Sequence, residues 1–345
     1  MTELRSVTPP RSATIATIAE EVGVSVATVS KVLNGRADVS PETRARVEAS
    51  LDRHRYRRRA KRRADAGGQL DLVFHGLGSE WAVEIIRGVE AVASHARVDV
   101  VLSQLGGSHR LPQRWLDRVL ARRPAGLLLV LCHPTEPQRR QLRRQQIPFV
   151  VVDTDSATSA SVPTVGSNNW NGGLLATRHL LELGHRRIAV ITGPRDVLCA
   201  RTRAAGFRSA HDEAGVPVDP ALVRYGTFQV KDGYRLGMEL LTAPHRPTAI
   251  FAGSDLQALG VLRAARQLGI DVPRELSVIG YDNLPVAAWT GPALTTVHQP
   301  LRDMATTATQ MLLELARGAD LPTCRVDLVA ELVVRESTAR PAPHR

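Results

Sequence analysis

The sequence has no uninterrupted apolar segment of the ~18–20 residues that a membrane-spanning helix requires. The first 14 residues contain no apolar stretch of the kind found in secretion signals, which predicts a cytoplasmic protein. The three cysteines, Cys132, Cys199 and Cys324, lie far apart and form no Cys-x-x-Cys pair. Their spacing excludes a disulfide framework and the usual zinc motifs, and it is typical of a reducing compartment.

Motifs of the common enzyme classes are also missing. The chain contains no Gly-x-Ser-x-Gly turn, no His-Glu-x-x-His motif and no Gly-x-x-x-x-Gly-Lys-Ser/Thr loop. Gly76 and Gly78 follow the first predicted strand, but Trp81 stands where a dinucleotide site has its third glycine. The eleven histidines show no metal-ligand spacing. We therefore predict that the protein is not an enzyme and has no cofactor or metal.

Lysine is scarce, with three residues against 42 arginines, and the positive charge is unevenly placed. Residues 1–66 hold 14 basic and 8 acidic side chains, whereas residues 67–345 hold 31 and 26. The length of 345 residues allows two or three domains. A small basic domain ahead of a nearly balanced large one indicates a nucleic-acid-binding module followed by a region with a separate function.

Three short helices are predicted at the N-terminus. Thr14 can cap a helix over residues 15–22, whose apolar residues recur at helical spacing. After a turn at Gly23, Ser25 can cap a second helix over 26–33. The triplet 40–42, Ser-Pro-Glu, predicts the start of a third helix that reaches about residue 54. This order is that of a helix-turn-helix domain, and the alternative is an ordinary three-helix bundle with a solvated second helix.

A basic run follows these helices, with eight lysines or arginines among residues 53–63. Such a run is usually disordered and solvated when free. Because it directly follows the helical module, we favour a segment that orders against DNA phosphates.

Beyond residue 68 the pattern changes to alternating strands and helices. Continuous valine, isoleucine and leucine runs predict buried parallel strands, with two successive series indicating two α/β lobes. The predicted strands are 70–74, 98–103, 126–131, 149–152, 162–165, 187–192, 222–225, 249–252 and 277–281. The predicted helices are 81–94, 113–122, 172–183, 202–214, 232–241 and 256–268.

Polar and aromatic residues lie just after several of these strands, where parallel sheets bind ligands. Carboxylates and an arginine can hold neighbouring hydroxyls, and aromatic rings can cover the apolar faces of a sugar. The alternative is that the acids cap helices and the rings belong to the core. The candidates are Ser79, Trp81, Asp153, Arg203, Phe228, Ser254 and Asp282, with Trp170 and Trp289 as weaker ones.

Several long motifs resemble the lac/galactose repressor (LacI/GalR) family. Residues 14–34, TIATIAEEVGVSVATVSKVLN, are similar to its DNA-binding motif almost throughout. Residues 183–189, 277–283 and 294–300 are similar to core segments of that family in the same order. The resemblance extends from about residue 14 to residue 338.

The resemblance implies an N-terminal all-α helix-turn-helix domain and a two-lobed α/β core of the periplasmic-binding-protein type, with parallel sheets. The expected DNA-binding domain is 1–57, followed by a basic hinge at 58–68 and a core at 69–340. The lobes would exchange strands near Val162, Val297 and Arg325. Lobe one would then comprise about 69–162 and 297–325, and lobe two about 163–296 and 326–340.

The resemblance also implies a role for each candidate residue. Val26, Ala27 and Lys31 would read base edges in the major groove. The residues expected at phosphates are Ser25, Thr28, Ser30, Asn34 and Ser40, joined in the hinge by Tyr56, Arg58, Arg59, Arg62 and Arg63. The seven candidates named above would hold the effector, although Ser254 stands where relatives often have asparagine.

The hinge departs from the family pattern Tyr-x-Pro-Asn-x-x-Ala-Arg-x-Leu. Arg58 and Arg59 replace the Pro-Asn pair, and Asp65 replaces the leucine that enters the minor groove in the family. This departure argues against central kinking of the DNA. No heptad repeat follows Val334, so a coiled-coil-tailed tetramer is not expected.

We therefore expect a cytoplasmic homodimer that binds palindromic double-stranded operator DNA, without a membrane partner. Its affinity for the operator would change when a small molecule, in the first place a sugar or short oligosaccharide, binds between the lobes. One alternative is a sugar-handling enzyme with a basic nucleic-acid-binding arm. Others are a sugar-binding protein without a DNA function and a regulator with a purine-type corepressor.

Overall fold

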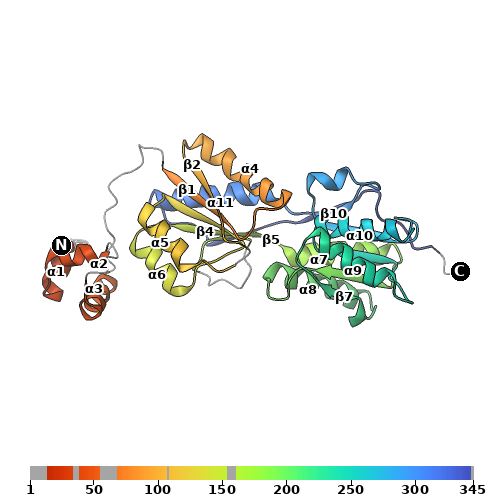
Figure 1. The fold of residues 1–345 in the computed structure, drawn as a ribbon, viewed down its shortest axis with the longest axis horizontal. Helices are drawn as coiled ribbons and strands as arrows, with labels where there is room; N and C mark the ends of the chain where they lie inside the picture. The colour runs from red at the N-terminus through yellow and green to blue at the C-terminus, as the bar shows by residue number, and fades with distance from the viewer. Residues whose placement is uncertain (1–13, 34–38, 55–67, 107–108, 154–160, 343–345) are drawn as a thin grey trace, which may run out of the picture.

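A computed structural model describes residues 14–33, 39–54, 68–106, 109–153 and 161–342. Figure 1 shows a small helical domain and two α/β lobes that follow one another along the long axis of the molecule. Within the described residues, no helix combines the length and apolar character needed to cross a bilayer.

The N-terminal domain consists of three helices: α1 (Ile15–Val22), α2 (Val26–Leu33) and α3 (Pro41–Arg53). Thr14 caps α1, since its hydroxyl oxygen accepts a hydrogen bond from the Thr17 amide at 3.2 Å. Gly23 makes the turn to α2 with a φ of +71°, a conformation that favours glycine. Ile18, Val29 and Val47 meet in the core, each with no exposed surface. The predicted helix-turn-helix arrangement is confirmed.

Lobe one is built on a sheet of six parallel strands in the order β11-β5-β4-β3-β1-β2. Helices α4 and α11 cover one face of this sheet, and α5 and α6 cover the other. The strands are β1 (Gln69–Phe74), β2 (Asp99–Gln104), β3 (Gly126–Val130), β4 (Phe149–Val152), β5 (Thr164–Ser167) and β11 (Arg325–Leu328). The helices are α4 (Glu80–His95), α5 (Gln113–Arg122), α6 (Glu136–Arg144) and α11 (Leu301–Ala316).

Lobe two has a second sheet in the order β12-β10-β9-β8-β6-β7, with α7 and α8 on one face and α9 and α10 on the other. The sequence predicts a parallel sheet, and five of its strands are parallel. The edge strand β12 differs, because it runs antiparallel to β10. The strands are β6 (Ile188–Thr192), β7 (Val223–Tyr225), β8 (Ala249–Ala252), β9 (Ser277–Asp282), β10 (Thr295–His298) and β12 (Glu331–Val333). The helices are α7 (Asn169–Glu182), α8 (Leu198–Glu213), α9 (Val230–Leu241) and α10 (Asp255–Gln267), with short 3-10 helices at Pro220–Leu222 and Pro285–Ala288.

The chain passes between the lobes three times, as expected, but each crossing lies later than predicted. Residues 164–167 pair with β4 and β11, so lobe one extends beyond 162 to Ser167. Residues 297–298 pair with β9 and belong to lobe two, and residues 325–328 remain in lobe one. The crossings therefore lie at about 168, 299 and 329, where the pairing of strands changes sheet.

Helices α7 and α8 are in close contact through glycine. A Cβ atom on Gly206 of α8 would lie 2.1 Å from the Trp170 carbonyl oxygen of α7. A Cβ on Gly173 of α7 would lie 2.2 Å from the Arg203 carbonyl oxygen of α8. Any larger residue at either position would separate the two helices. This contact fixes the position of Arg203 at the inner end of lobe two.

Candidate functional site

One face of α2 is exposed to solvent. Val29, Val32 and Leu33 are buried against α1 and α3, which leaves Val26, Ala27 and Lys31 on the outer side. Val26 is 51% exposed, so its side chain is available for contact with another molecule. An exposed face of small and apolar side chains with one cation fits the width of a major groove.

The candidate phosphate contacts are partly engaged in capping. The Ser25 hydroxyl oxygen accepts a hydrogen bond from the Thr28 amide at 3.1 Å and lies 2.8 Å from the Thr28 hydroxyl. Ser40 caps α3 by accepting from the Thr43 amide at 3.3 Å, and Ser30 is half-exposed on α2. The remaining candidates, Asn34, Tyr56, Arg58, Arg59, Arg62 and Arg63, lie outside the described residues.

Arg203 of α8 is the centre of a buried polar network at the inner end of lobe two. Its Nε donates a hydrogen bond to Asn169 Oδ1 at 2.8 Å, and its Nη1 donates to the Gly253 carbonyl at 2.6 Å. Its Nη2 donates to Gln299 Oε1 at 3.1 Å. The guanidinium carbon also lies 3.6 Å from the centre of the Tyr281 ring. These contacts hold the guanidinium group in one orientation.

Two carboxylates of the predicted set accompany this arginine. Asp282 Oδ1 lies 3.9 Å from Arg203 Nη1, and both side chains are almost fully buried. Asp153 of lobe one accepts a hydrogen bond from Gln299 Nε2 at 3.2 Å. Burial raises the pKa of both carboxyl groups, whereas the charge of Arg203 acts to lower it. Because Gln299 lies at the second crossing, it connects Arg203 of lobe two to Asp153 of lobe one.

Phe228 and Ser254 also lie close to Arg203. The Phe228 ring centre is 5.5 Å from the guanidinium carbon, and the Phe228 backbone has a φ of +62°. The Ser254 hydroxyl donates to the Phe228 carbonyl at 2.9 Å and accepts from the Gln257 amide at 3.1 Å. Ser254 is therefore occupied within lobe two as a helix cap.

Ser79 and Trp81 lie in lobe one, at the start of α4. Ser79 is the residue before the helix, but its side chain makes no capping hydrogen bond, and Trp81 packs on the core of that lobe. Among the described contacts, none joins either residue to Arg203. The structure thus brings five of the seven candidates together and places two apart from them.

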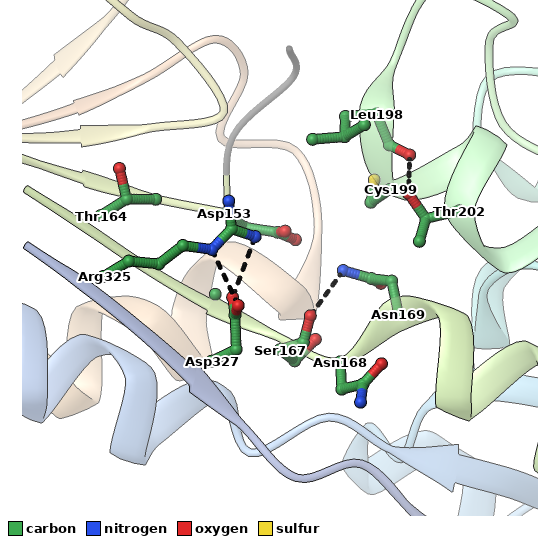
Figure 2. A pocket seen from close by; sticks show the side chains of 11 residues that line it. Asp153, Thr164, Ser167, Asn168, Asn169, Leu198, Cys199, Thr202, Arg325 and Asp327 are labelled. Atoms are coloured by element: carbon green, nitrogen blue, oxygen red, sulfur yellow. Dashed lines mark hydrogen bonds and ion pairs between the residues drawn. The ribbon is translucent and has the colours of Figure 1, made fainter. Parts of the chain in front are cut away.

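A cavity of about 220 Å³ lies between the lobes, beside this network. Figure 2 shows side chains from both lobes around it: Arg325 and Asp327 of β11 are paired with each other on one side, and Asn169 and Thr202 of lobe two lie on the other. Of the seven predicted effector residues, only Asp153 lines the cavity. The lining residues are Asp153, Thr164, Gly166, Ser167, Asn168, Asn169, Leu198, Cys199, Thr202, Arg325 and Asp327.

Most of these lining residues are missing from the sequence prediction. Leu198 and Cys199 begin the helix after β6, and Asn169 begins the helix after β5. Attention to every position that follows a strand would therefore have found them. Asp327 belongs to β11, which the apolar pattern does not predict. Burial raises the pKa of the Cys199 thiol to about 12, so this cavity residue is a neutral thiol at physiological pH.

A further buried carboxyl group lies behind the network. Asp255 accepts hydrogen bonds from the Thr296 hydroxyl at 2.5 Å and from the Leu284 amide at 2.7 Å. Burial raises its pKa to about 7, well above the ordinary value of 3.8. In this range the folded protein binds more protons than the unfolded chain, so stability falls as the pH rises from about 4 to about 7 and then levels off.

We expect Asp255→Asn to remove much of this pH dependence, on the order of 3 kcal/mol between pH 5 and pH 8. The amide is of the same size and can still accept from Leu284 while donating to the Thr296 hydroxyl. Urea unfolding at several pH values measures the effect, with Asp196→Asn as the control because Asp196 is exposed. An unchanged pH profile in Asp255→Asn would show that another group causes the dependence.

Comparisons with known proteins agree with this architecture. Residues 14–59 match the family model for bacterial regulatory proteins of the lacI family, and residues 177–338 match a periplasmic binding protein-like domain. The chain is 34% identical over 331 residues to the HTH-type transcriptional repressor PurR of Escherichia coli O139:H28, covering 95% of this chain and 97% of the relative.

Two solved structures are similar over nearly the whole chain. A complex of the transcriptional regulator CelR with cellobiose is 32% identical with a TM-score of 0.71, covering 94% of this chain and 99% of that one. The lac repressor dimer bound to operator and the anti-inducer ONPF is 27% identical with a TM-score of 0.68, covering 95% and 100%. The full-length similarity, the helix-turn-helix domain and the two-lobed core show that this chain belongs to the LacI family of bacterial transcriptional regulators.

Proposed function

We propose that this repressor is a homodimer that binds a palindromic operator, and that a sugar or short oligosaccharide in the interlobe cavity changes its operator affinity. The observation that carries the proposal is the polar cavity formed by both lobes beside the Arg203–Gln299–Asp153 connection. A ligand that contacts both walls favours one arrangement of the lobes over another. The cytoplasm is the expected location of such a regulator.

The chemistry of the cavity supports a polyol. Asp153 and Asp327 can accept hydrogen bonds from hydroxyls, and so can the Thr202 hydroxyl, which donates its own proton to the Leu198 carbonyl. Arg325, which is paired with Asp327, and Asn169 have further N–H groups that can donate to a ligand. The cavity of about 220 Å³ has the size for one sugar ring, and a longer saccharide would extend toward the cleft mouth. The structural relative CelR was solved with cellobiose, which makes that disaccharide the first ligand to test.

Calorimetric titration with cellobiose, its monosaccharide and hypoxanthine tests the effector class. The same ligands are added to operator-binding assays with DNA from upstream of the gene. We expect saturable heat with a sugar and a change of operator affinity at the same concentrations. Binding of hypoxanthine without binding of any sugar would replace the sugar by a purine-type corepressor.

We propose that Val26, Ala27 and Lys31 read base edges, and that the serine and threonine hydroxyls around them contact phosphates. The exposure of these three side chains on α2 supports this assignment. Valine and alanine can contact a thymine methyl group, and lysine can donate to guanine. Tyr56 and the hinge arginines are proposed as further phosphate contacts on the basis of the sequence.

Lys31→Ala is expected to weaken operator binding by about 1–3 kcal/mol while leaving the fold intact. The weakening follows from the loss of hydrogen bonds to one base pair, so preference at that position should also relax. Lys231→Ala is the matched control, since Lys231 is an exposed lysine of lobe two. Anisotropy titrations with operator and with single-base variants measure both effects, and unchanged affinity for all duplexes would remove Lys31 from the reading face.

A further inference from the structure

The positive charge of the core is concentrated in one short part of lobe one. Residues 110–146 contain nine arginines and two acidic residues, in α5, α6 and their flanking loops. Residues 67–345 as a whole contain 31 basic and 26 acidic residues, so the rest of this region has 22 and 24. The excess positive charge of the core therefore comes entirely from this segment.

These helices direct their last turns toward the DNA-binding domain. In a parallel sheet with covering helices, each helix runs opposite to the strands, so its C-terminus lies at the end where the strands begin. Strand β1 begins at Gln69, directly after the linker from the helix-turn-helix domain. Arg122 and Arg123 end α5, and Arg143 and Arg144 end α6, at this same end of lobe one.

Direct contacts join the end of α6 to the DNA-binding domain. Arg144 Nη1 lies 2.8 Å from Glu48 Oε1 of α3. Gln145 Nε2 donates a hydrogen bond to the Leu33 carbonyl, at the end of α2, at 2.8 Å. Figure 1 shows α5 and α6 on the side of lobe one that faces α1, α2 and α3. The arginine-rich surface is thus continuous with the domain that binds the operator.

Local acids neutralise only part of this surface. One carboxylate, that of Glu136, pairs with Arg139, Arg140 and Arg143. Arg122 forms an ion pair with the buried Asp71, and Arg144 forms one with Glu48. The side chains of Arg140 and Arg143 remain 53% and 65% exposed, and Arg114 and Arg118 are exposed as well. The helix dipole stabilises cations in the last turn of a helix. It does not account for Arg114 and Arg118, which lie earlier in α5.

We propose that this α5–α6 arginine surface binds the phosphates of DNA that flanks the operator, as a second DNA contact separate from the helix-turn-helix domain. The inference rests on the proposed operator binding. Arginine matches phosphate geometry with two parallel hydrogen bonds, and its charge is independent of pH in the physiological range. Such contacts carry no base information, so they would strengthen binding to any flanking sequence.

The test compares two DNA lengths. An operator is selected from a random duplex library and prepared as a short duplex of operator only and a long duplex with about 15 added base pairs on each side. The variant is Arg118→Gln, Arg140→Gln and Arg143→Gln, which leaves the pairs with Asp71 and Glu48 in place. The matched control removes the same charge from exposed arginines of lobe two, Arg263→Gln, Arg266→Gln and Arg274→Gln.

We expect the wild type to show a steeper dependence of log affinity on log salt with the long duplex than with the short one. If the three arginines of each protomer neutralise four to six phosphates per dimer, the difference is about 4 to 5 units. The triple variant should lose this difference and bind the short duplex as the wild type does. Hydroxyl-radical footprints should extend into the flanks with the wild type and the control and not with the variant.

Equal salt dependence on the two duplexes in the wild type, or an equal loss in the lobe-two control, would overturn the flank contact. Equal salt dependence on the two duplexes would favour an acidic protein, in place of DNA, as the partner of this surface. Failure of the wild type to prefer the short operator over random DNA would instead contradict the proposed operator binding. The two duplex lengths therefore separate the failure of one proposal from the failure of the other.

Discussion

Replacing Arg203 by leucine is expected to lower the free energy of unfolding by about 3–5 kcal/mol at neutral pH and to abolish the effector response. Leucine fills part of the space but leaves Asp153 and Asp282 buried without their cation. The Gln299 oxygen would also lose the Arg203 donor, and Asn169 Oδ1 would keep only the Tyr281 hydroxyl at 3.4 Å. Urea unfolding measures the first effect, and operator binding with and without sugar measures the second.

The loss of stability should depend on pH in a defined direction. The pKa values of Asp153 and Asp282 are already raised by burial, and the loss of Arg203 would raise them further. The cost of the buried charges applies above these pKa values and disappears below them. The difference between Arg203→Leu and the wild type should therefore be smaller at pH 5 than at pH 8.

Two further variants separate charge from packing. Arg201→Leu, an exposed arginine of the same helix, should change stability by less than about 0.5 kcal/mol. Arg203→Lys keeps the charge but cannot bind Asn169, Gly253 and Gln299 together, so it should recover stability more than effector response. A stable Arg203→Leu protein that responds normally to its effector would show that the network is not the link between the lobes.

The second large effect is expected in the hinge. Replacing Arg57, Arg58, Arg59, Arg62 and Arg63 by alanine should flatten the plot of log affinity against log salt by about 4 to 7 units, for about four to eight phosphates per dimer. These residues lie outside the described ranges, so the expectation rests on their charge and their position after the helix-turn-helix domain. Affinity should fall for all sequences alike, with little change in the preference for operator.

The hinge prediction differs from the flank prediction in its dependence on DNA length. Loss of hinge arginines should affect the short and the long duplex equally, because the hinge follows the domain that contacts the operator itself. The operator should also bend less than in relatives with a leucine in the minor groove, since Asp65 carries a negative charge. A strong central kink in a complex with DNA, or an unchanged salt dependence, would contradict this account of the hinge.

Sequence patterns predict elements best where local signals agree. Helices α1, α2 and α3 combine a capping hydroxyl with an apolar stripe, and they form within a residue or two of the predicted bounds. Helix α6 is missed because Leu142 is its one buried apolar residue among arginines and glutamines. The first and third crossings are displaced because β5 pairs with β4 and β11 pairs with β5, which places Thr164 and Arg325 in lobe one. Local sequence patterns do not reveal such pairing.

The sequence predicts residues of the buried polar network around Arg203 better than it predicts the residues that line the cavity. Asp153 follows β4, Asp282 ends β9, and Arg203 lies in the second turn of α8; the three lie together near the carboxyl ends of the strands. The cavity depends in addition on how far the lobes stand apart and which strand occupies the edge of lobe one. Arg325 and Asp327 reach it from β11, which is far in sequence from every other strand of that sheet.

The three crossings also determine when each part of the protein can fold during its synthesis on the ribosome. The helix-turn-helix domain is complete once α3 has emerged, because its core uses only residues 15–53. Neither lobe is complete at that stage or for long afterwards, since α11 and β11 of lobe one and β12 of lobe two come from residues 301–333. Ser337 also bonds to Val278 and Thr295 within lobe two. A nascent chain would therefore acquire its DNA-binding domain early and both walls of the interlobe cavity together at the end.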